Sequence, residues 1–308
     1  MSTHSHKRSL HFEQLDVFAE RPLEGNALAV FTDARGLSSH EMQSIARETN
    51  LSETTFILPR APEIEREQGV HVRIFTTVEE LPFAGHPTLG TAAWLYSNRP
   101  HLLSAGSHTI RLDLRAGRIP VTFHPPDPGM PGVFGTMRQN DPVFGQVHEP
   151  AALATALNLS PSDLDPSAPA QTVSTGMPFC IVPLRSLEVA QRLQIPPHTA
   201  QPYLSRSDAK FFFCIAPADP ASGARWHARM QFYNGEDPAT GSASGCAIAW
   251  LVRHGLVPSA EPVILEQGIE IHRPSRIHLR ATRNGDSVTD VFVGGRTIPV
   301  AKGHLFLP

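Results

Sequence analysis

Two short turns, each directly before an apolar stretch, contain the residues best suited to bind a ligand. These residues are Gly85 and His86 in the first turn, and Asp237, Gly241 and Ser242 in the second. Each apolar stretch predicts a helix, and the first N–H groups of a helix have no acceptor within it and form the positive end of its dipole. Such helix starts favour anions, so these five residues are candidates for binding a carboxylate.

Each of these side chains also has an ordinary structural explanation. Ser242 suits the N-cap of its helix, and His86 suits a hydrogen-bonded histidine near a helix start. Asp237 suits the turn before Pro238. These alternatives stay open on the pattern alone. Cys246, one turn inside the second helix, is expected to be packed rather than reactive.

Both turns belong to a segment that occurs twice in the chain. Residues 73–95 align without a gap with residues 229–251 at a fixed offset of 156, and His86 falls on Ser242. The seven identities in these 23 positions pair Arg73 with Arg229, Glu80 with Glu236, Pro82 with Pro238, Gly85 with Gly241, Ala93 with Ala249, Trp94 with Trp250 and Leu95 with Leu251. We infer an ancient duplication, in which a pseudo-twofold axis would bring the two helix starts to one cleft.

The first copy shows how these turns are positioned. Residues 70–75 read as an apolar strand, and residues 89–95 (LGTAAWL) form an unbroken small and apolar run. A helix of this composition has no polar face and is expected to be buried on all sides. Pro87 suits its first turn, where no hydrogen-bond donor is lost.

Glu53 stands at the start of an apolar strand predicted for residues 54–58. A helix predicted for residues 39–48 precedes it, because Ser38 and Glu41 form a capping-box pattern. A carboxylate at the edge of an apolar strand has two interpretations. It is either a solvent-exposed end residue or a base presented into the cleft.

The remaining pattern indicates an α+β protein with two pseudo-symmetric domains, each a barrel-like β-sheet wrapped around a central buried helix. The first domain is expected over residues 9–125 and to be joined by a C-terminal strand within 295–308. The second is expected over residues 126–294. Residues 125–150, rich in Pro, Gly and Asp, are expected to form the crossing between the halves.

Composition excludes several classes of function. The 308 residues have a formal net charge of −3, and the scattered basic residues indicate neither a nucleic-acid partner nor a membrane surface. Three cysteines in apolar surroundings predict a reducing compartment rather than a disulfide framework. The N-terminus lacks an apolar signal region, and no apolar run approaches a membrane span, so a cytoplasmic protein is expected. No metal-ligand spacing or phosphate-binding glycine loop appears, so no metal or cofactor is expected.

Several of these stretches carry a family resemblance. The matching segments are QLDVFAERPLEGNALAVF (14–31), LSETTFILP (51–59), ELPFAGHPTLGTAAWL (80–95) and GEDPATGSASGCAIAWL (235–251). The sequence resembles the phenazine biosynthesis PhzF-like family, which has the diaminopimelate epimerase fold. The stretch EQGIEIHRPSRI (266–277) matches a later motif of the family, except that His272 stands where a glycine is usual.

The resemblance implies a homodimer without cofactor, with its active site between the two domains. It implies cofactor-independent isomerisation of a small carboxylate of the dihydro-hydroxyanthranilate type, in which one carboxylate moves a proton between carbons of the substrate ring. By position, it assigns Glu53 as the general acid/base. By position, it also places His86, Asp237, Gly241 and Ser242 among the residues that line the site and hold the substrate. With Gly85 from the repeat, we therefore expect His86 and Asp237 to be catalytic beside Glu53, and Gly85, His86, Gly241 and Ser242 to bind the substrate.

Two alternatives remain. An epimerase or racemase of a small amino or hydroxy acid on the same fold usually uses one cysteine at each helix start, but His86 and Ser242 occupy those positions here. A non-catalytic protein that binds small carboxylates would have no need for Glu53 together with Asp237. A carboxylate that moves a proton on one face of the substrate therefore favours the isomerase.

Overall fold

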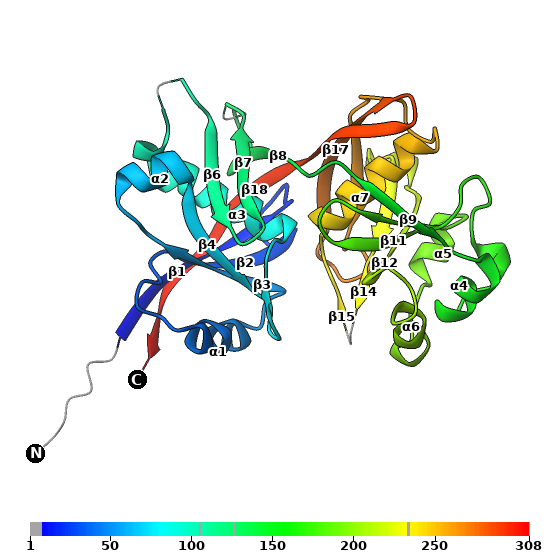
Figure 1. Ribbon diagram of the computed structural model, residues 1–308, viewed down its shortest axis with the longest axis horizontal. Coiled ribbons are helices and arrows are strands. Elements are labelled where there is room, and N and C mark those ends of the chain that lie inside the picture. Colours follow the sequence, from blue (N-terminus) through cyan, green and yellow to red (C-terminus); the bar gives the residue numbers. More distant parts are fainter. Residues whose placement is uncertain (1–7, 105, 126, 233–234, 308) are drawn as a thin grey trace, which may run out of the picture. The chain divides into compact units, whose positions relative to one another are not determined.

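The computed structural model describes residues 8–104, 106–125, 127–232 and 235–307. The chain divides into two units. The first holds the described residues up to Thr136 together with those from Arg296 onward, and the second holds Met137–Gly295. Sheet and helix occur together in both units, which confirms the predicted α+β class (Figure 1).

In the first unit, the described residues form a closed eight-stranded barrel, because β18 pairs with both β8 and β1. The order around the barrel is β1-β2-β3-β4-β6-β7-β8-β18, and the short β5 extends β4. The strands are β1 (Arg8–Val17), β2 (Asn26–Phe31), β3 (Glu53–Leu58), β4 (Val70–Phe75), β5 (Glu80–Leu81), β6 (Thr109–Leu114), β7 (Gly117–Phe123), β8 (Val133–Arg138) and β18 (Ser287–Leu307).

The second unit contains a sheet in the order β9-β10-β11-β12-β13-β16-β17-β18, and β14 and β15 form a separate hairpin. Its strands are β9 (Val143–Val147), β10 (Gln171–Ser174), β11 (Pro178–Pro183), β12 (Phe211–Pro217), β13 (Trp226–Arg229), β14 (Gln231–Phe232), β15 (Gly235–Glu236), β16 (Val263–Gln267) and β17 (Ser275–Asn284).

The strand directions repeat between the units. In the first, β2 runs parallel to β3 and β4 runs parallel to β6, while β1–β2, β3–β4 and β6–β7 are antiparallel. In the second, β11 runs parallel to β12 and β13 runs parallel to β16, while β10–β11, β12–β13 and β16–β17 are antiparallel. This shared alternation is what a duplicated unit produces.

Each sheet packs around the buried helix that the repeat predicts. Helix α3 (Gly85–Asn98) contacts β1, β2, β3, β6 and β7, and helix α7 (Gly241–Arg253) contacts β10, β11, β12 and β17. Both helices lack an exposed face over most of their length, as a run of small and apolar residues requires. In Figure 1 the ribbon of α3 is cyan and that of α7 is orange.

The shorter helices lie outside these two. Helix α1 begins as predicted, because Ser38 and Glu41 form the complete capping box. Its buried face, with Met42 and Ile45, packs against Phe31 and Phe56 of the barrel. The bounds of these shorter helices are α1 (Ser39–Thr49), α2 (Pro62–Gln68), α4 (Pro150–Ala156), α5 (Leu187–Gln191) and α6 (Pro197–Leu204). Single 3₁₀ turns lie at η1 (Pro100–Leu102), η2 (Pro161–Asp163) and η3 (Pro220–Ser222).

The Arg and Glu that the two copies share form the same ion pair in each unit. Arg73 donates from Nε to Glu80 Oε1 at 2.8 Å and from Nη2 to Oε2 at 2.7 Å. Arg229 donates from the same two atoms to Glu236, at 2.8 and 2.6 Å. Each pair ties a barrel strand to the residue five positions before its buried helix, so the identities at the start of the repeat are structural.

The structure differs from the prediction near the C-terminus. The sequence predicts a C-terminal strand within residues 295–308, but β18 begins at Ser287 and is continuous through the glycines at 294 and 295. It pairs with β17 as far as Gly294 and with β1 from Thr297 onward, so two partners in succession hold it extended. The segment 125–150 likewise contains β8 and β9 within the expected crossing.

His272 adopts the left-handed backbone conformation, with φ 58°. Glycine has no steric cost in this region, which accounts for the glycine that the family resemblance places here. We expect His272→Gly to keep or raise the free energy of unfolding by up to about 1 kcal/mol, and His272→Val to lower it by about 1–2 kcal/mol. Urea denaturation of the three proteins tests this, and a valine variant as stable as the wild type would contradict it.

Candidate active site

The first unit brings three polar residues together at one edge of its barrel. Asn26 begins β2 and Glu53 begins β3, and these neighbouring strands run parallel, so both residues lie at the same edge. His86 is the second residue of α3. The beginnings of two strands and one helix therefore converge, and the Glu53 carboxylate lies beside His86, another of the predicted site residues.

The distances define this group. His86 Nδ1 lies 3.3 Å from Asn26 Nδ2 and 3.5 Å from Glu53 Oε2. The His86 ring is almost fully buried, while 16% of the Glu53 side chain is exposed. Burial lowers the pKa of His86 to about 3, so the ring is neutral near neutral pH. Its contact with Glu53 is therefore not an ion pair at that pH.

The neutral ring has one N–H, on either Nδ1 or Nε2. Nδ1 has the amide nitrogen of Asn26 at 3.3 Å and a carboxylate oxygen of Glu53 at 3.5 Å, so it accepts from the first in one tautomer and donates to the second in the other. Within the described part of the chain, Nε2 is buried and has no hydrogen-bond partner. A buried ring nitrogen without a partner is costly, and a bound substrate with a polar group at this point would satisfy it.

The second unit holds a different set of residues at the start of α7. Helix α7 begins at Gly241, and Ser242 is its second residue, matching His86 in α3. The N-cap position belongs to Thr240, so the N-cap prediction for Ser242 is wrong. Both small residues are buried. As at any helix start, the first N–H groups of α7 have no acceptor within the helix.

Asp237 lies in the loop before this helix and is 8% exposed. Its Oδ2 accepts a hydrogen bond of 2.6 Å from the Thr240 hydroxyl. Its backbone carbonyl accepts one of 2.7 Å from Gln267 Nε2. These contacts hold the Asp237 carboxylate and backbone in a defined position in the loop before α7.

Three residues of these two groups escaped the sequence analysis: Asn26, Thr240 and Gln267. All three lie inside the stretches that carry the family resemblance. Each is also a polar residue at the end of an apolar strand or just before an apolar helix. That second feature is the signal that identifies them.

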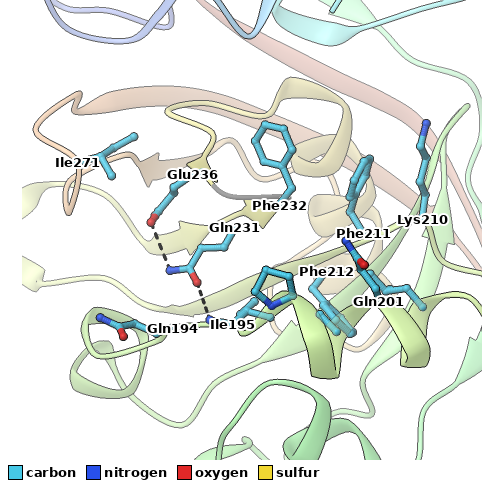
Figure 2. A pocket seen from close by; sticks show the side chains of 14 residues that line it. Gln194, Ile195, Gln201, Lys210, Phe211, Phe212, Gln231, Phe232, Glu236 and Ile271 are labelled. Atoms are coloured by element: carbon cyan, nitrogen blue, oxygen red, sulfur yellow. Dashed lines mark hydrogen bonds between the residues drawn. The ribbon is translucent and has the colours of Figure 1, made fainter. Parts of the chain in front are cut away.

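A pocket of about 680 Å³ in the second unit is separate from this group (Figure 2). Its wall includes Phe211, Phe232 and Glu236, but none of the predicted site residues. Gln231 closes one side by accepting a hydrogen bond from the Ile195 backbone and donating to Glu236. Its two titratable lining groups already have partners: Glu236 accepts from Arg229, and the Lys210 ammonium lies 5.5 Å from the centre of the Phe211 ring.

All three cysteines are buried in the second unit. Burial raises the pKa of the Cys246 thiol to about 11 and that of Cys214 to about 12, and raises that of Cys180 well above its ordinary value. None of them is a ready nucleophile or base near neutral pH. In the described part of the chain, no helix is both long and apolar enough to cross a membrane.

Comparison with known proteins agrees with this geometry. The family model for phenazine biosynthesis-like proteins matches residues 15–303. The chain belongs to this family. It is 36% identical over 300 residues to the trans-2,3-dihydro-3-hydroxyanthranilate isomerase of Pseudomonas aeruginosa, covering 95% of this chain and 98% of that relative. As a member of this family the chain is an isomerase, as the sequence predicted.

Solved structures give the same result for the fold. A protein described as a predicted epimerase of Pseudomonas aeruginosa matches with a TM-score of 0.80 and 34% identity, covering 96% of this chain and 99% of that one. A Bacillus anthracis phenazine biosynthesis protein of the PhzF family matches with a TM-score of 0.82 and 26% identity, covering 97% and 100%. The predicted barrel-and-helix fold is confirmed.

Proposed function

We propose that this isomerase acts on a small carboxylate of the dihydro-hydroxyanthranilate type and moves a proton between two of its carbons, with Glu53 as the general acid/base. The contact of Glu53 with His86 at the start of α3 is the observation that carries the proposal. Glu53 is a carboxylate that remains partly accessible beside a helix start suited to an anion. A base next to an anion site is what proton abstraction from such a substrate needs.

The proposed reaction has balanced steps within one substrate molecule. Glu53 accepts a proton from one carbon, the electron pair moves into the conjugated system of the substrate, and Glu53 returns the proton to a second carbon. The charge that develops is stabilised by the backbone N–H donors at the start of α3. Because a proton leaves and returns, the step requires no oxidant or reductant.

We propose that residues of the second unit act on the same substrate. Gly85, Gly241 and Ser242 would bind it through helix-start N–H groups, and Asp237 would exchange a proton with one of its heteroatoms. The shared repeat and the family membership support this assignment. We further propose the homodimer and the cytoplasmic location that the resemblance implies, and sedimentation of the purified protein should give twice the mass of the chain.

An epimerase with two thiols is disfavoured by the residues present. The helix-start positions that would hold cysteines are His86 and Ser242, and the thiols of the chain have raised pKa values through burial. A non-catalytic protein that binds small carboxylates would share the anion site but would catalyse no exchange of a carbon-bound proton, and the family to which the chain belongs favours the isomerase.

Incubating the purified protein with trans-2,3-dihydro-3-hydroxyanthranilate in D₂O tests the proposal by proton NMR. We expect loss of the substrate signals and incorporation of deuterium at a ring carbon of the product. Binding by calorimetry without conversion or deuterium exchange would overturn the proposal in favour of a binding protein. Absence of both binding and conversion would overturn the proposed substrate class.

A further inference from the structure

We infer that Thr240 and Gln267 are positioning residues, which fix the Asp237 carboxylate through a hydrogen-bond relay that runs in one direction. This inference rests on the proposed function only for the role of Asp237. Gln267 Nε2 donates to Thr240 Oγ1 at 2.9 Å, and Thr240 Oγ1 donates to Asp237 Oδ2 at 2.6 Å. The hydroxyl has a single proton and two acceptors within reach, Asp237 Oδ2 at 2.6 Å and the Met230 thioether sulfur at 3.2 Å. The carboxylate is the nearer and stronger acceptor, so the proton is directed to it.

The orientation of the Gln267 amide is determined by its other contacts. Its Oε1 accepts from the Thr240 backbone N–H at 3.0 Å, and its Nε2 also donates to the Asp237 carbonyl at 2.7 Å. Rotating the amide by 180° would place Nε2 against the Thr240 N–H, donor against donor, and Oε1 against the Asp237 carbonyl, acceptor against acceptor. The donor end of Gln267 therefore faces Thr240 Oγ1 and Asp237 O.

Burial makes this relay a strong constraint. Gln267 is fully buried, and Thr240 and Asp237 are 7% and 8% exposed. In such surroundings water does not readily replace a lost partner, so a satisfied network favours a single arrangement. Thr240 also accepts at its carbonyl from the Ser244 N–H at 2.9 Å, so one residue orients both the start of α7 and the carboxylate.

The first copy of the repeat supports a specific role. At the offset of 156, Asp237 falls on Leu81 and Thr240 falls on Ala84. The carboxylate and the hydroxyl that holds it are thus absent together from the first unit, although α3 and α7 begin at matching residues. Helix formation alone does not require the hydroxyl, because α3 forms without it.

The same loop has a second anchor that is independent of the carboxylate. Ser275 Oγ donates to the Pro238 carbonyl at 2.8 Å. Ser275→Ala therefore weakens the attachment of the loop without removing a partner of the Asp237 side chain. It provides the matched control for substitutions in the relay.

The test compares Thr240→Val, Thr240→Ser and Ser275→Ala for kcat and KM on trans-2,3-dihydro-3-hydroxyanthranilate. Valine keeps the shape of threonine and removes the hydroxyl, and we expect it to lower kcat by about 10- to 100-fold, the cost of a displaced catalytic group, while KM changes little. Thr240→Ser restores the hydroxyl and should recover activity to within about threefold. Ser275→Ala should lower the melting temperature but leave kcat near that of the wild type.

A crystal structure of the Thr240→Val protein provides the readout that does not depend on activity. The inference expects the Asp237 side chain to adopt a different or second conformer, and an unchanged single conformer would overturn it. If Thr240→Val fails to fold, Gln267→Glu is examined in the same way, because it removes the donor end of the relay and should draw the Thr240 proton away from Asp237. Wild-type activity in Asp237→Asn would overturn the proposed role of Asp237 and leave the structural result to decide the relay.

Discussion

Glu53→Gln is expected to lower kcat for the isomerisation by about 10²- to 10⁴-fold, the usual contribution of a general acid/base. Glutamine has nearly the same shape as glutamate but cannot accept a proton from carbon. Since neutral His86 contributes no charge to the contact with Glu53, the substitution should not leave an unpaired cation in the protein. KM should change little, because the loss concerns the transition state rather than substrate binding.

Glu48→Gln is the matched control for this prediction. Glu48 is an exposed residue of α1 in the same unit, so it loses the same charge away from the site. Kinetic measurements should be paired with deuterium incorporation from D₂O into the substrate. Exchange that survives in Glu53→Gln at the wild-type rate would remove Glu53 from the mechanism and leave His86 as the nearest group able to move a proton.

The repeat allowed the buried helices and the strand of Glu53 to be predicted from the sequence. Small and apolar runs determine burial locally, and the fixed offset of 156 shows which positions correspond. The same reasoning missed Asn26 and Gln267, because their partners are distant in sequence. Asn26 meets His86 across 60 positions and Gln267 meets Thr240 across 27, so only the folded sheet of each unit brings them together.

The wrong N-cap for Ser242 has a more local cause. Thr240, Gly241 and Ser242 are all residue types found at helix N-caps, so composition does not decide among them. The structure selects Thr240 because Gln267 binds its backbone N–H and its hydroxyl is committed to Asp237. The helix start is thus fixed by tertiary contacts rather than by the local pattern.

Arg229→Met is expected to lower the free energy of unfolding by about 3–5 kcal/mol, the cost of removing one partner of a buried ion pair. The side chains of Arg229 and Glu236 are each 7% exposed. Methionine replaces most of the aliphatic volume but leaves the Glu236 carboxylate buried without its cation. It also removes the Nη1 donor that serves the carbonyls at the end of α5, those of Ala190, Gln191 and Leu193.

The repeat supplies the control, because Arg73→Met removes the same donor fork from the first unit. The side chains of Arg73 and Glu80 are 19% and 17% exposed, and Nη2 has one further partner, the Ser39 hydroxyl. Water can solvate part of what remains, so we expect a loss of only about 1 kcal/mol. Urea denaturation followed by circular dichroism measures both values, and equal losses in the two variants would contradict the argument from burial.

Pairing Arg229→Met with Glu236→Gln separates the two contributions to the loss. If the unpaired buried charge causes most of the damage, the double variant should recover a large part of the stability, since it removes the Glu236 charge. The second carboxylate near Arg229, that of Glu270 at 3.7 Å, keeps His227 at 3.0 Å as its partner. If the three carbonyls of the α5 end dominate, the double variant should stay as unstable as Arg229→Met. The first outcome is expected, because a buried charge without a partner costs more free energy than a neutral carbonyl that loses one hydrogen-bond donor.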